Sequence, residues 1–121
     1  MELNEYQERA MATCMESSRN HSYMMDNLIA EVGEYAGKVA KAKRKGWIEY
    51  DEEGNIVWVA DIKDMDKFEA ELKKEAGDIL WQWSGLCTVM GWSLEDVAEG
   101  NLKKLASRQD RGVIDGEGDN R

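Results

Sequence analysis

Hydrophobic residues recur at intervals of three and four through most of the chain, the pattern of amphipathic helices. Four such stretches are predicted, and they span roughly residues 4–19, 23–45, 64–90 and 94–111. Proline is absent, and Gly46 and Gly91 stand where the second and third helices are expected to end. The pattern therefore predicts an all-α, four-helix-bundle-like protein.

Two helix starts carry capping signals. Asn4 with Gln7 three residues later is typical of a capping box, and this places the first helix start at Asn4. Ser93, with Asp96 in the following turn, is the expected cap of the fourth helix.

Residues 47–60 break the helical pattern. The segments WIEY and IVWVA flank the acidic turn DEEGN, which predicts a small β-hairpin insert between the second and third helices. The hairpin could pack on the bundle, bind a partner or cover the mouth of a site, and packing is favoured. Residues 112–121, GVIDGEGDNR, lose the helical pattern and are expected to form a flexible tail.

Length and composition indicate a single domain spanning residues 1–121. With 121 residues and 42% hydrophobic content, one chain builds only a modest core, so we expect self-association into a homodimer or homotetramer. The net charge of −9 argues against nucleic acid or an anionic membrane as the main partner.

The two cysteines, Cys14 and Cys87, lie in helical apolar patterns and are expected to be free thiols. The amino-terminal residues show no basic segment followed by an apolar run, and no apolar stretch approaches the roughly 18 residues of a membrane span. A cytoplasmic protein is expected.

Two carboxylate pairs stand out as candidate metal ligands. Glu31 and Glu34 lie in the second helix, and Glu75 and Asp78 lie in the third, each pair at i,i+3 spacing. Glu75 interrupts an apolar stripe made of Phe68, Leu72, Ile79, Trp83 and Leu86. In an antiparallel helical hairpin both pairs would lie roughly 17 to 22 Å from the connection, so they can form one cation site. The alternative is ordinary surface charge.

A polar and basic stripe runs along the fourth helix. Asn101, Lys104, Arg108 and Arg111 follow one another at intervals of three, four and three residues, which places them on one helical face. Lysine and arginine side chains are suited to phosphate oxygens. A phosphate-binding stripe and a solvated basic face are equally compatible with this spacing.

Three segments together resemble a known family. LIAEVGEYAGKVAK, ELKKEAGDILWQWSGL and NLKKLASRQDRG are similar to the MazG-like, all-alpha nucleoside triphosphate pyrophosphohydrolases, in particular the short single-domain type of phages and bacteria. The resemblance implies magnesium-dependent hydrolysis, by a metal-activated water, of a (deoxy)nucleoside triphosphate to the monophosphate and pyrophosphate. Manganese is a possible substitute for magnesium.

The resemblance also implies roles for individual residues. Glu31, Glu34, Glu75 and Asp78 would ligate the metal, and Asn101, Lys104 and Arg108 would approach the metal or the triphosphate. Either Glu34 or Glu31 could act as general base, and Glu34 is slightly favoured. Arg111 is added by its spacing, and Lys104 and Arg108 would also stabilise charge on the departing pyrophosphate. The chain departs from the family's EExxE pattern at Ala30.

Candidates for recognising the base are fewer. Trp81 could stack on it, and Asn27 or His21 could hydrogen-bond its edge, although a core position for Trp81 and a loop or capping role for His21 are favoured. Lys38 is a candidate substrate ligand or a plain intrahelical ion pair with Glu34.

Two other functional classes are alternatives to the enzyme. A di-iron carboxylate protein would carry ExxH motifs on its helices, and the sequence has none. A non-enzymatic helical interaction protein remains the other alternative. Substrate selection among bases and sugars does not follow from these motifs.

Overall fold

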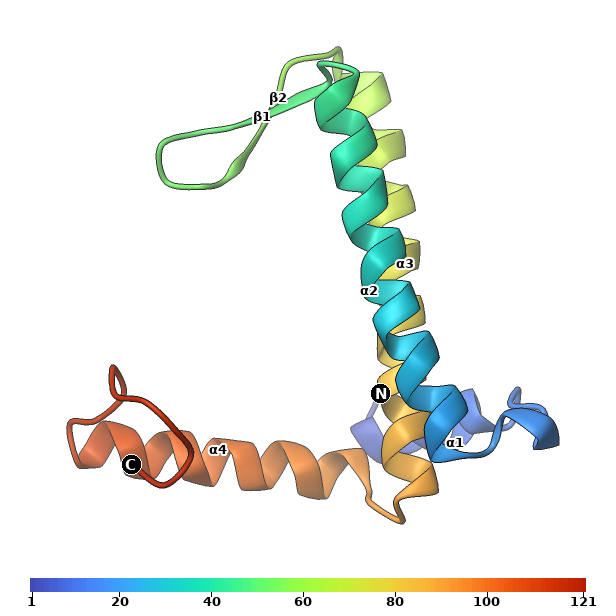
Figure 1. Ribbon diagram of the computed structural model, residues 1–121, viewed down its shortest axis with the longest axis vertical. Helices are drawn as coiled ribbons and strands as arrows, with labels where there is room; N and C mark the ends of the chain where they lie inside the picture. Colours follow the sequence, from blue (N-terminus) through green and yellow to red (C-terminus); the bar gives the residue numbers. More distant parts are fainter.

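The computed structural model describes residues 1–121 as four α-helices and one small antiparallel sheet (Figure 1). The elements are α1 (Leu3–Met11), a 3-10 turn (Glu16–Ser18), α2 (His21–Arg44), β1 (Ile48–Tyr50), β2 (Ile56–Trp58), α3 (Ile62–Val89) and α4 (Leu94–Asp110). The all-α class, with a hairpin between the second and third helices, is confirmed. No helix is both long enough and apolar enough to cross a membrane.

The long helices α2 and α3 form an antiparallel pair, and they lie side by side over most of their length (Figure 1). Their interface includes Gly85 of α3, where a Cβ atom would lie 2.4 Å from the sulfur of Met24 in α2. Met24 is fully buried, so its side chain has little room to move aside. The absence of a side chain at position 85 therefore lets the two helices meet.

The base of the hairpin packs on the helix pair. Ile48 of β1 is buried with Ala42 and Phe68, and Trp58 of β2 lies with its ring centroid 5.2 Å from that of Phe68. Asp61 caps α3 by accepting from the backbone amides of Lys63 and Asp64. The outer part of the hairpin remains exposed, including the side chains of Tyr50, Ile56 and Val57.

Helix α1 is shorter than predicted, because it ends at Met11 and not near Arg19. The prediction of a capping box at Asn4 is also wrong, since the helix begins at Leu3 and the cap position Glu2 makes no side-chain bond. Asn4 instead bonds to Glu95, and the Gln7 side chain accepts from the backbone amide of Leu94. Both polar side chains are thus used to attach α1 to the start of α4.

Helix α4 begins at the predicted cap, where Ser93 accepts a hydrogen bond from the backbone amide of Asp96. The helix then points away from the α2–α3 pair (Figure 1). Only 13 of the 121 residues are buried, so one chain leaves much apolar surface in contact with water. Exposed apolar side chains of α2, α3 and α4 include Ile29, Val32, Leu80, Leu102 and Leu105.

Both cysteines are free, as predicted. Cys87 is buried in α3, and Cys14 is half-buried between α1 and the 3-10 turn. Burial raises the pKa of the Cys87 thiol above its ordinary value, because the thiolate would lose its hydration. This thiol is therefore packed as an apolar group and is not activated as a nucleophile.

Candidate metal and substrate site

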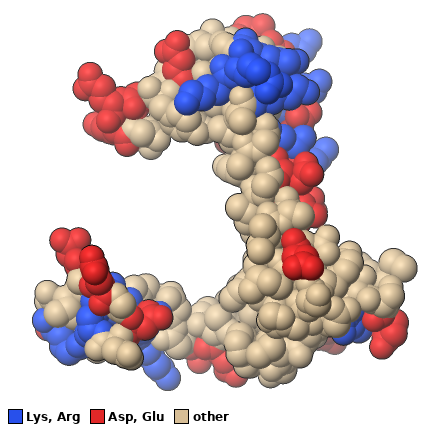
Figure 2. Space-filling view, viewed as in Figure 1, with Lys and Arg blue, Asp and Glu red and all other residues tan.

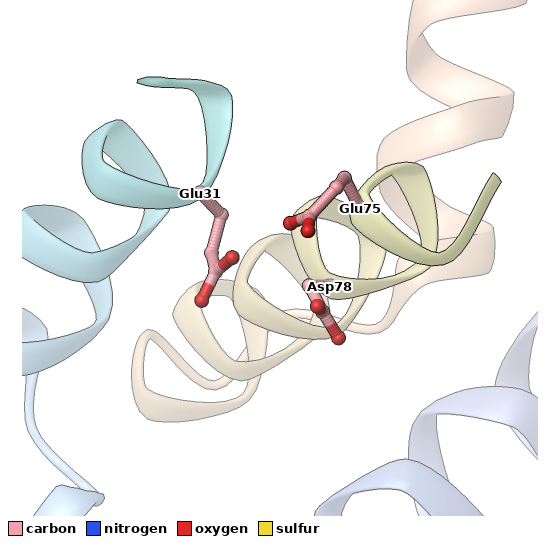
Figure 3. Close-up of side chains that lie close together, drawn as sticks. All are labelled: Glu31, Glu75 and Asp78. Carbon is pink, nitrogen blue, oxygen red and sulfur yellow. The ribbon is translucent and has the colours of Figure 1, made fainter. Parts of the chain in front are cut away.

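Three carboxylates from the two long helices meet at one level of the pair. Each of Glu31, Glu75 and Asp78 offers a carboxylate oxygen within 4.8 Å of the others (Figure 3). Glu75 and Asp78 reach the same side of α3 because three residues make almost one helical turn, and Glu31 faces them from α2. The predicted meeting of the two carboxylate pairs is confirmed for these three residues.

Glu34, the fourth predicted ligand, is exposed and lies outside this group. It follows Glu31 by one turn of α2, and its charge is still felt by Glu31. The structure therefore divides the predicted set into three grouped carboxylates and one neighbour.

The pKa of Glu31 is raised above its ordinary value. Loss of hydration is the largest cause, followed by the negative charges of Asp78, Glu75 and Glu34. Mutual repulsion of this kind favours a proton or a cation at the cluster. All the grouped donors are carboxylate oxygens, the ligands that magnesium and manganese prefer, so the residues present fit a hard divalent cation.

Tyr6 of α1 was not identified as a site residue from the sequence. Its pKa is raised, first by burial and then by the negative charge of Asp78, so its phenol lies within the electrostatic reach of the cluster. In the sequence Tyr6 reads only as one apolar position of a short helix. No local pattern connects it with a residue 72 positions later in the chain.

Lys38 provides the positive charge beside the carboxylates. Its Nζ lies 3.6 Å from a carboxylate oxygen of Glu75 and 3.9 Å from one of Glu71. The intrahelical ion pair with Glu34 is not formed, since the side chain crosses to α3 instead. Lys38 thus joins the two helices at the edge of the cluster.

The basic residues of α4 lie elsewhere in this chain, because α4 turns away from the helix pair (Figure 1). Lys104 and Arg108 both bind Asp119, at 3.1 and 2.9 Å, as residues 112–121 fold back along the helix. Arg108 is only 5% exposed. Its hydrogen bond, followed by that of Lys104, holds the pKa of the Asp119 carboxyl below its usual range.

Asn101 and Arg111 belong to the same stripe. Asn101 is exposed, and Arg111 donates hydrogen bonds to the Ser107 hydroxyl and the backbone carbonyl of Arg121. Lys104, Arg108 and Arg111 are therefore held by acidic and carbonyl groups of the tail, and one chain alone does not bring the stripe to the carboxylate cluster.

Comparison with known sequences identifies the family of this chain. A family model described as the MazG nucleotide pyrophosphohydrolase domain matches residues 19–113, which include all four carboxylates and the basic stripe. The chain belongs to the MazG family. It is similar to the "Gene 37 protein" of Mycobacterium phage L5, with 40% identity over 100 residues, which cover 83% of this chain and 75% of that protein. No solved structure matches.

Membership in the MazG family is consistent with a metal site, since members are typically metal-dependent and this chain groups three carboxylates. The family assignment also makes a hydrolase acting on nucleotide pyrophosphate bonds the expected enzyme class.

Two of the three candidate base-recognition residues of this MazG chain have other partners. The indole nitrogen of Trp81 donates to the carbonyl of Ala10 at 3.1 Å and to the Thr13 hydroxyl at 3.0 Å, which ties α3 to the end of α1. The side-chain amide of Asn27 donates to the carbonyl of Tyr23, within α2. His21 is exposed at the first position of α2, beside the cap Asn20, in agreement with a terminal structural position.

Proposed function

We propose that this protein is a magnesium-dependent nucleoside triphosphate pyrophosphohydrolase, which converts a (deoxy)nucleoside triphosphate to the monophosphate and pyrophosphate. The observation that carries the proposal is the grouping of Glu31, Glu75 and Asp78 within 4.8 Å in a chain of the MazG family. Three carboxylates at this distance repel one another, and a divalent cation supplies the charge that compensates them.

The carboxylates have two tasks in this proposal. Glu31, Glu75 and Asp78 hold the ion, with Glu34 as the neighbouring fourth ligand. Bound magnesium or manganese offsets the charge of the triphosphate and makes water a better nucleophile near neutral pH. A carboxylate of α2 accepts the proton from the attacking water. Glu34 is preferred over Glu31 for this role, because it stands outside the three grouped ligands.

The leaving pyrophosphate needs positive charge, for which the α4 residues are suited. We infer that Lys104 and Arg108, with Asn101 and Arg111 beside them, stabilise the phosphates that depart. Arginine and lysine side chains bind a triphosphate more strongly than they bind a single carboxylate of the tail. The substrate would therefore displace Asp119 from Lys104 and Arg108.

Since α4 of one chain points away from its own carboxylates, this role requires α4 of a second copy. The exposed apolar side chains of α2, α3 and α4 support self-association, because a homodimer or homotetramer would bury them. Sedimentation at micromolar concentration is expected to give a dimeric or tetrameric mass. A monomeric mass at that concentration would contradict the shared site.

A turnover screen tests the proposed activity directly. The natural deoxyribonucleoside and ribonucleoside triphosphates are incubated with the protein and magnesium or manganese, and the product anion is identified. We expect pyrophosphate, and not orthophosphate, to accompany the monophosphate, with no reaction in excess chelator. Triphosphates that stay intact with both metals would rule out the enzyme.

A further inference from the structure

The face of the helix pair that carries the carboxylates continues towards the hairpin and becomes a cavity. The cavity has a volume of about 360 Å³, within the range of small-molecule sites. Its lining includes Lys38 and Lys41 of α2, Lys67 and Glu71 of α3, and Trp47, which immediately precedes β1. None of the residues that line this cavity has a role in the proposed function.

Helical spacing places the cavity and the carboxylate cluster on one face of the helix pair. Lys38 follows Glu31 by two turns, and Lys67 and Glu71 precede Glu75 by two turns and one turn on the same face of α3. The centre of the cavity lies roughly 10 to 15 Å from the cluster at about 1.5 Å per residue. Lys38 belongs to both, since it lines the cavity and lies 3.6 Å from Glu75.

The chemistry of the side chains changes along this face. Carboxylates are grouped at one end, and lysines gather with an indole at the end near the hairpin, where Figure 2 shows the basic side chains clustered on the helix pair. Trp47 is 36% exposed, and the Nζ atom of Lys45 lies over its ring, 4.9 Å from the centroid. An accessible aromatic ring is a stacking surface for any nucleobase.

The lysines supply hydrogen-bond donors only, which suit the oxygen acceptors of a ribose or a base. A second phosphate group is a poorer occupant, because Asp64 and Glu71 line the same cavity and offset two of its three lysine charges. The mixture of donors, acceptors and an aromatic wall fits a neutral, polar and planar group.

We propose that this cavity receives the nucleoside end of the triphosphate, with the base stacked on Trp47 and with Lys41 and Lys67 donating to base or ribose oxygens. The assignment rests on the proposed function, which places the phosphates at the carboxylate cluster. It makes Trp47 a determinant of substrate binding and gives the hairpin insert a role, because the insert begins at this residue. The pyrophosphate then leaves on the side of the cluster away from the cavity.

Steady-state kinetics of Trp47→Ala with dATP, dGTP, dCTP and dTTP test this inference. Loss of one stacking surface is expected to raise KM about fivefold to a hundredfold and to leave kcat within about twofold, because the reacting phosphate is not touched. Trp47→Phe should retain most of the affinity. Trp92→Ala is the matched control, since Trp92 is 47% exposed and follows the far end of α3.

Inorganic tripolyphosphate distinguishes binding of the nucleoside from binding of the phosphates. As a competitive inhibitor it should bind Trp47→Ala as it binds the parent protein, because it has no base. Lys67→Gln is expected to have a smaller effect and to raise KM about threefold. Its control is Lys73→Gln, which lies on the opposite face of α3. Circular dichroism melting of each variant checks that the fold is retained.

An unchanged KM in Trp47→Ala, with turnover intact, would overturn this inference and leave the proposed function standing. Equal weakening of nucleotide and tripolyphosphate would also overturn it. If neither the parent protein nor any variant hydrolyses triphosphates, calorimetric binding of the same four nucleotides decides whether the cavity is a nucleoside site. A loss specific to Trp47→Ala supports the nucleoside site without the proposed reaction, and no nucleotide binding by the parent protein refutes it.

Discussion

Glu75→Gln is expected to lower kcat/KM for triphosphate hydrolysis by on the order of a thousandfold, the scale of removing a group that stabilises transition-state charge. Glu75 is the central carboxylate of the site, since it belongs to the group within 4.8 Å and also contacts Lys38 at 3.6 Å. The amide keeps the shape of the side chain and removes its charge, so cation affinity falls while packing is kept. Pyrophosphate release at saturating and subsaturating magnesium measures the effect.

Glu69→Gln provides the control, because it removes the same charge from an exposed position of α3 outside the cluster. It should leave kcat/KM within about twofold. Magnesium is expected to raise the melting temperature of the parent protein and of Glu69→Gln, since an ion that binds only the folded state stabilises it. Near-normal turnover by Glu75→Gln would show that the ion, or the reaction, lies elsewhere.

The helix pair and its carboxylates could be predicted because both depend on local spacing. Glu75 and Asp78 share a face in any regular helix, and the distances of Glu31 and Glu75 from the connection bring them level in any antiparallel hairpin. The hairpin itself followed from alternating apolar residues around an acidic turn with glycine. These features needed no knowledge of how distant elements pack.

The direction of α4 was not predictable in the same way. The spacing of Lys104 and Arg108 shows that they share a face, but it contains no information on what that face meets. The bonds that set the start of α4 join Asn4 and Gln7 to residues more than 80 positions later, and these polar side chains had a plausible local use as a cap. Local and distant partners therefore compete for the same side chains, which is why the capping-box prediction at Asn4 was wrong.

Contacts of single residues around the site were not predicted, for related reasons. Lys38 has a possible partner one turn earlier in Glu34, yet the structure pairs it with Glu71 and Glu75 across the helix interface. Asp119 lies in a glycine-rich tail without periodicity, where no pattern indicates a contact with Arg108. Each contact depends on the path of the chain between the elements, which spacing does not encode.

Phe68→Ala is expected to lower the free energy of unfolding by about 3 to 5 kcal/mol, the usual cost of emptying a buried phenylalanine position. Phe68 is 8% exposed and packs with Ala42 and Ile48, and its ring lies 5.2 Å from that of Trp58. Since domains of this size are stable by about 5 to 15 kcal/mol, the loss is a large fraction of the total. Urea unfolding followed by circular dichroism measures it.

Ile62→Ala is the matched control, because Ile62 begins the same helix and is 72% exposed. Its truncation should change the free energy of unfolding by no more than about 0.5 kcal/mol. Phe68 also joins the hairpin to the helix pair, so Phe68→Ala should shift tryptophan emission to longer wavelength as Trp58 becomes hydrated. A loss below about 1 kcal/mol with unchanged emission would mean that the hairpin is held by other contacts, and that the wall of the nucleoside cavity does not depend on this core.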